Sequence, residues 1–163
     1  MKKIIAIISV LFLSLTLQAQ VKYNEGDLVE NITLVNLEGD TVEIEDLRGK
    51  VVYLNFFATW CAPCIKEMNM IQDKMQDELK NEDFYFISLG RNHKPEALVV
   101  FKKNKGFTFN MGADTDKNIF SNFSEKGIPL NVVLDKKGKV ILNKTGFSEA
   151  GFKKMHKRIK KEL

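Results

Sequence analysis

The chain has 163 residues, a formal net charge of +4 and a hydrophobic fraction of 44%, which suit one compact domain with a sizeable core. It contains two cysteines, too few for a framework of several disulfides or for a four-thiolate zinc site. Basic and aromatic residues do not interleave on a common surface stretch, so nothing indicates nucleic-acid binding.

The N-terminal segment has the pattern of a secretory signal peptide. Met1-Lys2-Lys3 is a short basic start, Ile4–Leu17 is apolar, and Ala19 offers a small residue for cleavage. A membrane-spanning helix needs about 20 apolar residues, so we expect residues 1–19 to be removed and residues 20–163 to form the exported domain. The residue two positions before Ala19 is not small, so an uncleaved leader that anchors the domain to the inner membrane is the alternative. In both cases the expected location is the periplasm, which permits disulfides.

A hairpin and a longer strand are predicted at the start of the domain. Residues 32–35 and 41–44 are short β-branched and apolar runs, and Leu37-Glu38-Gly39-Asp40 between them has turn composition. Val51–Phe57 is a continuous apolar and aromatic run, which predicts a buried strand.

The two cysteines follow this strand, in Trp60-Cys61-Ala62-Pro63-Cys64. A strand, then Cys-x-x-Cys, then a helix is the context of a redox-active disulfide. Pro63 fits the first turn of that helix, where a backbone N–H is not needed. The alternatives are a structural disulfide, half of an intermolecular metal site, or two inert core thiols. A structural bridge around so short a loop would constrain little of the unfolded chain.

The rest of the chain is expected to alternate helices and strands. Helices are predicted at about 62–80, with Cys64, Met68, Ile71, Met75 and Leu79 on one face; at Pro95 to about Lys105, with Leu98, Val99 and Phe101 as its apolar residues; at about 117–123; and around Phe152, Met155, Ile159 and Leu163. Strands are predicted at 84–89, 107–109, 132–134 and 140–142. This order predicts an α/β fold with a mixed central sheet and helices on both faces. The cationic outer face of the last helix is interpreted as solvated, with contact to an anionic membrane surface as the alternative.

Residues 26–146 resemble the TlpA/ResA-like thiol–disulfide oxidoreductases, a branch of the thioredoxin fold. The matching segments are Asp46–Val52, Asn55–Cys64, Glu67, Gly127-Ile128-Pro129 and Asp135–Lys139. The resemblance implies a thioredoxin-like fold with an N-terminal β-hairpin and a central helix–strand insertion at 95–109.

The resemblance also implies roles for individual residues. Cys61 would be the exposed attacking thiol and Cys64 the buried resolving thiol of a redox-active disulfide. Pro129 would be a cis-proline packed against that disulfide, and the backbone of Ile128 would bind an extended substrate segment. Trp60 is either a core aromatic residue or a lid over the disulfide that contacts substrate.

Glu67 matches a buried glutamate that exchanges protons with the cysteines in the ResA branch. It lies three residues after Cys64, close to the same helical face, so its carboxylate can reach that thiol. A buried carboxyl has a raised pKa and can act as an acid or base near neutral pH. The alternative is an ordinary solvated glutamate. The wider thioredoxin family has an aspartate at the position of Asn55, and Glu67 would take over its task.

The chain departs from the family pattern at three places, and the departure at Leu130 is the one that affects the expected target. Asn69 stands where the family usually has proline two residues after Glu67. Leu130 stands where the family has Thr or Ser after the cis-proline, and we expect it beside the substrate groove. Gly90-Arg91-Asn92 stands where many members carry a Val-Asp pair.

The leading functional hypothesis is an exported protein-disulfide reductase that acts as a monomer. A membrane thiol-electron transporter would reduce it, and its substrates would be proteins with disulfides, apocytochrome c haem-site cysteines among them. The alternatives are a disulfide oxidase or isomerase, a thiol peroxidase and a copper-delivery module. No cofactor and no metal site is expected, because His93 and His156 have no second ligand at a useful spacing.

Overall fold

The computed structural model describes residues 22–163, so the expected leader at 1–19 lies outside the described residues. Its strands are β1 Thr33–Val35, β2 Thr41–Glu43, β3 Val51–Phe57, β4 Phe84–Arg91, β5 Met111–Asp114, β6 Leu130–Leu134 and β7 Val140–Thr145. Its helices are α1 Ala62–Lys74, α2 Pro95–Lys105, α3 Asn118–Ser121 and α4 Glu149–Glu162, with 3₁₀ turns η1 Ile44–Leu47 and η2 Glu78–Lys80. Within residues 22–163 every helix is too short or too polar to cross a bilayer.

The central sheet is mixed, as the sequence predicts. Its strand order is β5-β4-β3-β6-β7, with β3 in the middle. β3 is parallel to β4, and β4 is parallel to β5, whereas β6 is antiparallel to both β3 and β7. The predicted hairpin forms a separate two-stranded sheet, β1–β2. All seven residues of β3 are buried, which accounts for its uninterrupted apolar run.

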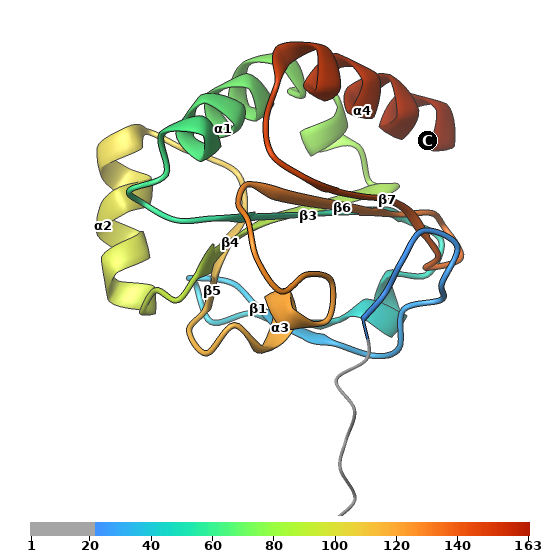
Figure 1. Ribbon diagram of the computed structural model, residues 1–163, viewed down its shortest axis with the longest axis horizontal. Coiled ribbons are helices and arrows are strands. Elements are labelled where there is room, and N and C mark those ends of the chain that lie inside the picture. The colour runs from blue at the N-terminus through green and yellow to red at the C-terminus, as the bar shows by residue number, and fades with distance from the viewer. Residues whose placement is uncertain (1–21) are drawn as a thin grey trace, which may run out of the picture.

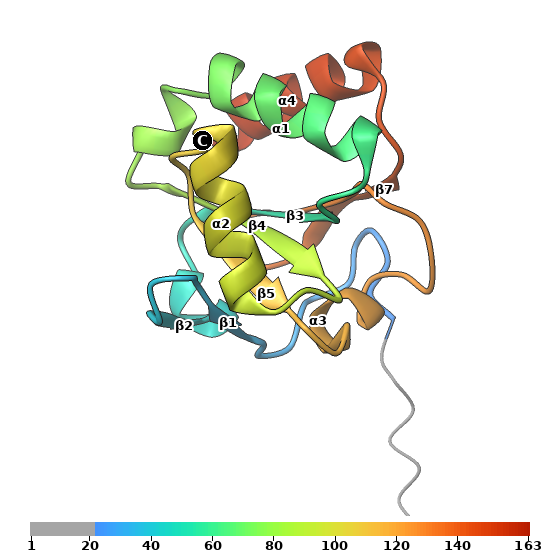
Figure 2. The same ribbon diagram turned by 90° about the vertical axis from the view of Figure 1, so that its left-hand side faces the viewer.

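Helices cover the two faces of the sheet unequally. In Figure 1, α1 and α4 lie together above the sheet, and α3 lies below it with the β1–β2 hairpin. Figure 2 shows α2 running along the side formed by β4 and β5. α4 buries Phe152, Met155 and Ile159, which confirms the apolar stripe predicted for the C-terminal helix.

Alternate residues of β3 therefore face two different hydrophobic clusters. Tyr53 and Phe57 belong to the cluster beneath α1 and α4, and Leu54 and Phe56 belong to the cluster on the opposite face. Asn55 stands between Tyr53 and Phe57 in the alternation, so its side chain emerges on the α1 face.

The helix predicted at 62–80 is shorter than expected. α1 ends at Lys74, Met75 leaves the helical conformation with a φ of −113°, and the chain resumes as η2. Met75 is fully buried and Leu79 is partly buried against the same core cluster. Because the apolar spacing continues through the break, no sequence signal marks the end of the helix.

The strand predicted at 107–109 is wrong. Phe107 and Phe109 are buried in a connection, with stacked rings whose centroids are 5.0 Å apart, and strand pairing starts only at Met111. The aromatic residues there serve packing and not a sheet ladder. Val99, expected among the apolar residues of α2, is 49% exposed, and Leu98 is the residue that this helix buries.

Candidate active site

Three connections meet at one end of the central sheet. Phe56 is paired with Leu130, and Phe57 is paired with Gly90. The carboxyl ends of β3 and β4 and the start of β6 therefore lie at the same end of the sheet. The segment that leads to the cysteines, the connection after β4, and the residues before β6 all begin there.

Cys61 and Cys64 form a disulfide at the start of α1, with an S–S distance of 2.08 Å. Cys61 is the N-cap of the helix, and its Sγ accepts the Cys64 N–H at 3.3 Å. Pro63 occupies the first turn, as expected. The unpaired N–H groups of a helix N-terminus favour a negative charge, so this position suits a thiolate.

The expected exposure of Cys61 needs correction. Cys61 is only 5% exposed in the disulfide form, because its sulfur lies within the first turn of α1 and is bonded to Cys64. Cys64 is fully buried, so the predicted order of accessibility is right. Trp60 is 75% exposed, which excludes the core alternative for this residue.

Glu67 is buried on the inner face of α1 and accepts two hydrogen bonds. Asn131 Nδ2 donates to its Oε1 at 2.8 Å, and Asn55 Nδ2 donates to its Oε2 at 3.0 Å. Its residue exposure of 2% excludes a solvated surface glutamate. The carboxylate is therefore held in place, one helical turn behind Cys64.

The polar network continues beyond this carboxylate. The Tyr53 hydroxyl donates to Asn131 Oδ1 at 2.6 Å, and Asn55 Nδ2 also approaches that oxygen at 2.9 Å. The Ser88 hydroxyl donates to Asn55 Oδ1 at 2.9 Å. Both amides are thus fixed in orientation, with their N–H donors toward Glu67.

Burial raises the pKa of Glu67 to about 7, and the hydrogen bonds from Asn131 and Asn55 oppose the shift in part. Burial, and then the charge of Glu67, raise the pKa of Tyr53 well above its ordinary value. Glu67 is therefore the group in this network that changes protonation near neutral pH.

A cleft of about 210 Å³ reaches Glu67 from the surface between β7 and α4. Glu67 and Asn131 lie among its polar lining residues, and Lys144 and Thr145 belong to β7. Phe147 and Phe152 contribute apolar walls. The cleft gives the buried carboxyl a path for exchanging protons with solvent.

The peptide bond between Ile128 and Pro129 is cis, as expected from the resemblance. Ile128 is partly buried and contacts both core clusters. The expectation that Leu130 borders a substrate groove is wrong. Leu130 is fully buried in the cluster opposite α1, because it is the first residue of β6 and its side chain points away from the α1 face.

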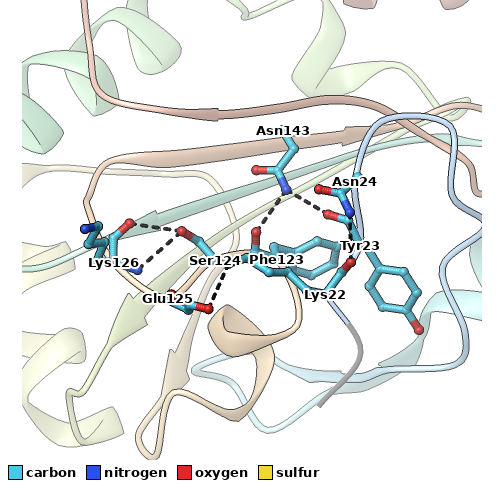
Figure 3. A network of polar contacts seen from close by, with 8 residues as sticks. All are labelled: Lys22, Tyr23, Asn24, Phe123, Ser124, Glu125, Lys126 and Asn143. Atoms are coloured by element: carbon cyan, nitrogen blue, oxygen red, sulfur yellow. Dashed lines mark hydrogen bonds and ion pairs between the residues drawn. The ribbon is translucent and has the colours of Figure 1, made fainter. Parts of the chain in front are cut away.

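Other contacts hold the connection between α3 and Pro129 in place (Figure 3). The Asn143 amide, on β7, donates to the carbonyl oxygens of Tyr23 and Phe123 at 2.9 and 3.0 Å. Lys22 and Glu125 form an ion pair at 3.2 Å. The first described residues of the chain are therefore tied to the connection that ends in the cis-proline.

Gly127 is required by the same connection, and its replacement by alanine is expected to destabilise the protein. Its φ of +89° is unfavourable for other residues, and an added Cβ would lie 2.4 Å from Thr145 Cγ2. The conformational part alone costs about 1–2 kcal/mol. Urea unfolding of Gly127→Ala measures the combined cost of the backbone conformation and of the close contact with Thr145. Thr145→Ser removes the clashing methyl group, so Gly127→Ala should cost less in that background. Equal stability of Gly127→Ala and wild type would contradict this.

The sequence indicated the cysteines, Glu67 and the cis-proline, but it missed the amides and hydroxyls around Glu67. Asn55, Ser88 and Asn131 are each a polar residue inside a buried strand. That interruption is a usable signal for a buried polar network. It does not show which residues are partners, because this depends on the pairing register of three strands.

Two solved structures that share this fold are named for thiol–disulfide chemistry. A putative protein disulfide isomerase from Bacteroides thetaiotaomicron is 31% identical, with a TM-score of 0.81 over 86% of this chain and 91% of that one. A putative thiol:disulfide interchange protein DsbE from Chlorobium tepidum is 26% identical, with a TM-score of 0.73 over 86% and 99%. With a disulfide capping the first helix of such a fold, this protein is a thiol–disulfide oxidoreductase with a thioredoxin-like fold.

The sequence comparisons narrow the class to a family. Residues 24–161 match the Redoxin family. The thiol-disulfide oxidoreductase ResA of Bacillus thuringiensis is 32% identical over 120 residues, which are 74% of this chain and 69% of that protein. The chain belongs to the Redoxin family, as a TlpA/ResA-like member of the thioredoxin superfamily.

Proposed function

We propose that this protein is an exported protein-disulfide reductase in which Cys61 attacks, Cys64 resolves and Glu67 carries the proton. The observation that supports this most is the buried carboxyl behind Cys64, whose pKa of about 7 lets it accept and release a proton at neutral pH. A disulfide with a purely structural role does not require a neighbouring carboxyl that accepts and releases protons.

The reduced protein would begin with the Cys61 thiolate. It attacks one sulfur of a substrate disulfide, forms a mixed disulfide, and releases the other substrate sulfur as a thiolate. Cys64 then gives its proton to Glu67 and attacks Cys61 Sγ. The Cys61–Cys64 bond forms, and the second substrate sulfur leaves as a thiolate that takes up a proton. Two electrons pass to the substrate, and a thiol donor must reduce the protein again.

Substrate would bind at the end of the sheet where the disulfide lies. Trp60 offers an exposed aromatic surface directly before Cys61. Pro129 begins the path into β6 at the same end of the sheet, and its carbonyl already accepts the Gly146 N–H at 2.7 Å. The N–H and C=O groups of Ile128 make no hydrogen bond to any group in residues 22–163, so they are available to an extended substrate segment.

The cellular setting is part of the proposal. Residues 1–19 would direct export and be removed, with an uncleaved inner-membrane anchor as the alternative. A membrane thiol-electron transporter would supply electrons in the periplasm. The ResA-like glutamate at position 67 favours apocytochrome c haem-site cysteines as the target.

A peptide with an oxidised Cys-x-x-Cys-His segment tests both the reaction and its direction. The fully reduced protein should convert it to the dithiol faster than it reduces a disulfide peptide without the histidine. Net oxidation of the reduced peptide by the oxidised protein would instead support an oxidase or isomerase. Consumption of hydrogen peroxide at a comparable rate would support a peroxidase.

A further inference from the structure

His93 lies in the connection between β4 and α2, and its ring reaches the turn before Cys61. The Thr59 N–H donates to His93 Nε2 at 3.1 Å. The Cys61 N–H closes the same turn by donating to the Ala58 carbonyl at 3.0 Å. The turn from Ala58 to Cys61 is therefore closed by one backbone hydrogen bond and contacted by the His93 ring, ahead of the disulfide and the first turn of α1.

The ring is placed by the backbone on either side of it. Asn92 adopts a left-handed conformation with a φ of 62°, which asparagine tolerates better than most residues. The Asn92 N–H donates to the Asp114 carbonyl at 2.8 Å, and the Thr115 hydroxyl donates to the His93 carbonyl at 3.1 Å. Contacts with the end of β5 thus fix the connection, and the half-buried ring is directed at Thr59.

We propose that His93 is a positioning residue for Cys61, whose neutral ring holds the Thr59 N–H and whose protonation releases the turn that carries Trp60 and Cys61. The inference rests on the proposed function only in taking Cys61 as the attacking thiol. It gives this protein a means of coupling its exchange rate to mildly acidic pH at a site separate from Glu67.

The hydrogen bond depends on the protonation state of the ring. Because Nε2 accepts, the proton of the neutral ring must be on Nδ1. A protonated ring has two donors and no acceptor, so its Nε2–H would face the Thr59 N–H. Burial lowers the pKa of His93 below its ordinary value of 6.5, which keeps the ring neutral at neutral pH.

No charged neighbour offsets this effect of burial. The charged side chains of the segments around His93 are those of Arg91, Lys94, Glu96, Asp114 and Asp116, and burial is the cause of the shift in the His93 pKa. Within residues 22–163 none of them forms an ion pair with His93. Arg91 lies over the Phe120 ring, and the Asp114 carboxyl accepts the Phe120 N–H at 2.8 Å.

Spectroscopy of the oxidised protein tests the contact without any substrate. Nitrogen NMR should show the Nδ1–H tautomer of His93 at pH 7.5. The Thr59 amide resonance should shift on acidification with a midpoint below 6.5. Trp60 is the one tryptophan of the chain, and its fluorescence should follow the same titration. The titration should survive Glu67→Gln and His156→Gln and disappear in His93→Gln. An Nε2–H tautomer, or a Thr59 amide that does not respond, would overturn the proposal.

Kinetics separate positioning from a merely structural role. At pH 7.5, His93→Ala should exchange with a small disulfide about three- to tenfold more slowly, as expected for the loss of one hydrogen bond. His93→Gln offers an acceptor that does not titrate, so at pH 7.5 it should exchange at the wild-type rate. At pH 5.5 it should exchange faster than wild type, because its contact with the Thr59 N–H persists. Equal pH profiles for His93→Gln and wild type would refute the switch. If the spectroscopic titration holds and no protein disulfide is reduced, the proposed function fails and the positioning role stands.

Discussion

Cys61→Ser is expected to reduce disulfide exchange to the background rate, a loss on the order of a thousandfold or more, because the attacking thiolate is gone. Cys64→Ser should retain the first step and fail in the second. It should therefore accumulate a mixed disulfide between Cys61 and the substrate. Cys64 is fully buried behind Cys61, so it has no direct access to an incoming disulfide.

Mass spectrometry of each reduced variant after mixing with an oxidised peptide measures both effects. Cys64→Ser should gain one peptide in a bond that dithiothreitol reverses, and Cys61→Ser should gain none. In the reduced wild type, an alkylating reagent should modify Cys61 much faster than Cys64. An adduct on Cys64 in the Cys61→Ser variant would reverse the assigned roles.

Some elements could be predicted from sequence because local signals fix their ends. β3 matches its predicted bounds of 51–57, where the apolar run begins and stops. α2 matches 95–105, because Pro95 opens it and Gly106 ends it in a left-handed conformation. The end of α1 has neither signal. Met75 and Leu79 preserve the helical spacing while the backbone changes course.

In the candidate site, too, some contacts could be predicted from the sequence and others could not. Cys61, Cys64 and Glu67 lie on one helix, so their spacing along the chain already places them together. Asn131 reaches Glu67 only because β6 pairs with β3 in a particular register. His93 reaches Thr59 through the connection after β4, and its sequence neighbourhood shows no partner for it. Contacts between elements were therefore not predictable from one chain.

Glu67→Gln is expected to change both the pH dependence of stability and that of exchange. In the unfolded chain this carboxyl titrates near the ordinary value of 4.5, and in the folded oxidised protein its pKa is about 7. Between these values the folded state binds more protons than the unfolded state. The free energy of unfolding therefore falls as pH rises from 4.5 to 7, by roughly 3 kcal/mol from this group.

Glutamine cannot ionise, so the variant should lose this decline. The replacement resembles the protonated carboxyl in shape and charge, and like it accepts from only one of the two asparagine amides while its own donor faces the N–H group of the other. Urea unfolding of the oxidised proteins at pH 4.5 and 8 measures the difference. Asp73→Asn removes an exposed carboxylate from the same helix, and it should behave like wild type. If the free energy of unfolding changed by the same amount between pH 4.5 and 8 in wild type and in Glu67→Gln, Glu67 would not be protonated near neutrality in the folded protein.

The kinetic effect of the same substitution identifies the proton acceptor. Resolution of the mixed disulfide by Cys64 should accelerate in wild type as pH rises through about 7, because ionised Glu67 takes the thiol proton. In Glu67→Gln the rise should be delayed until Cys64 ionises unaided, at roughly pH 8.5 or above for a thiol without activation. The first attack by Cys61 should change less, since the N-terminus of α1 still supports its thiolate. Single-turnover kinetics with a mixed disulfide preformed on Cys61 isolate the second step, and an unaltered pH profile there would remove Glu67 from the mechanism.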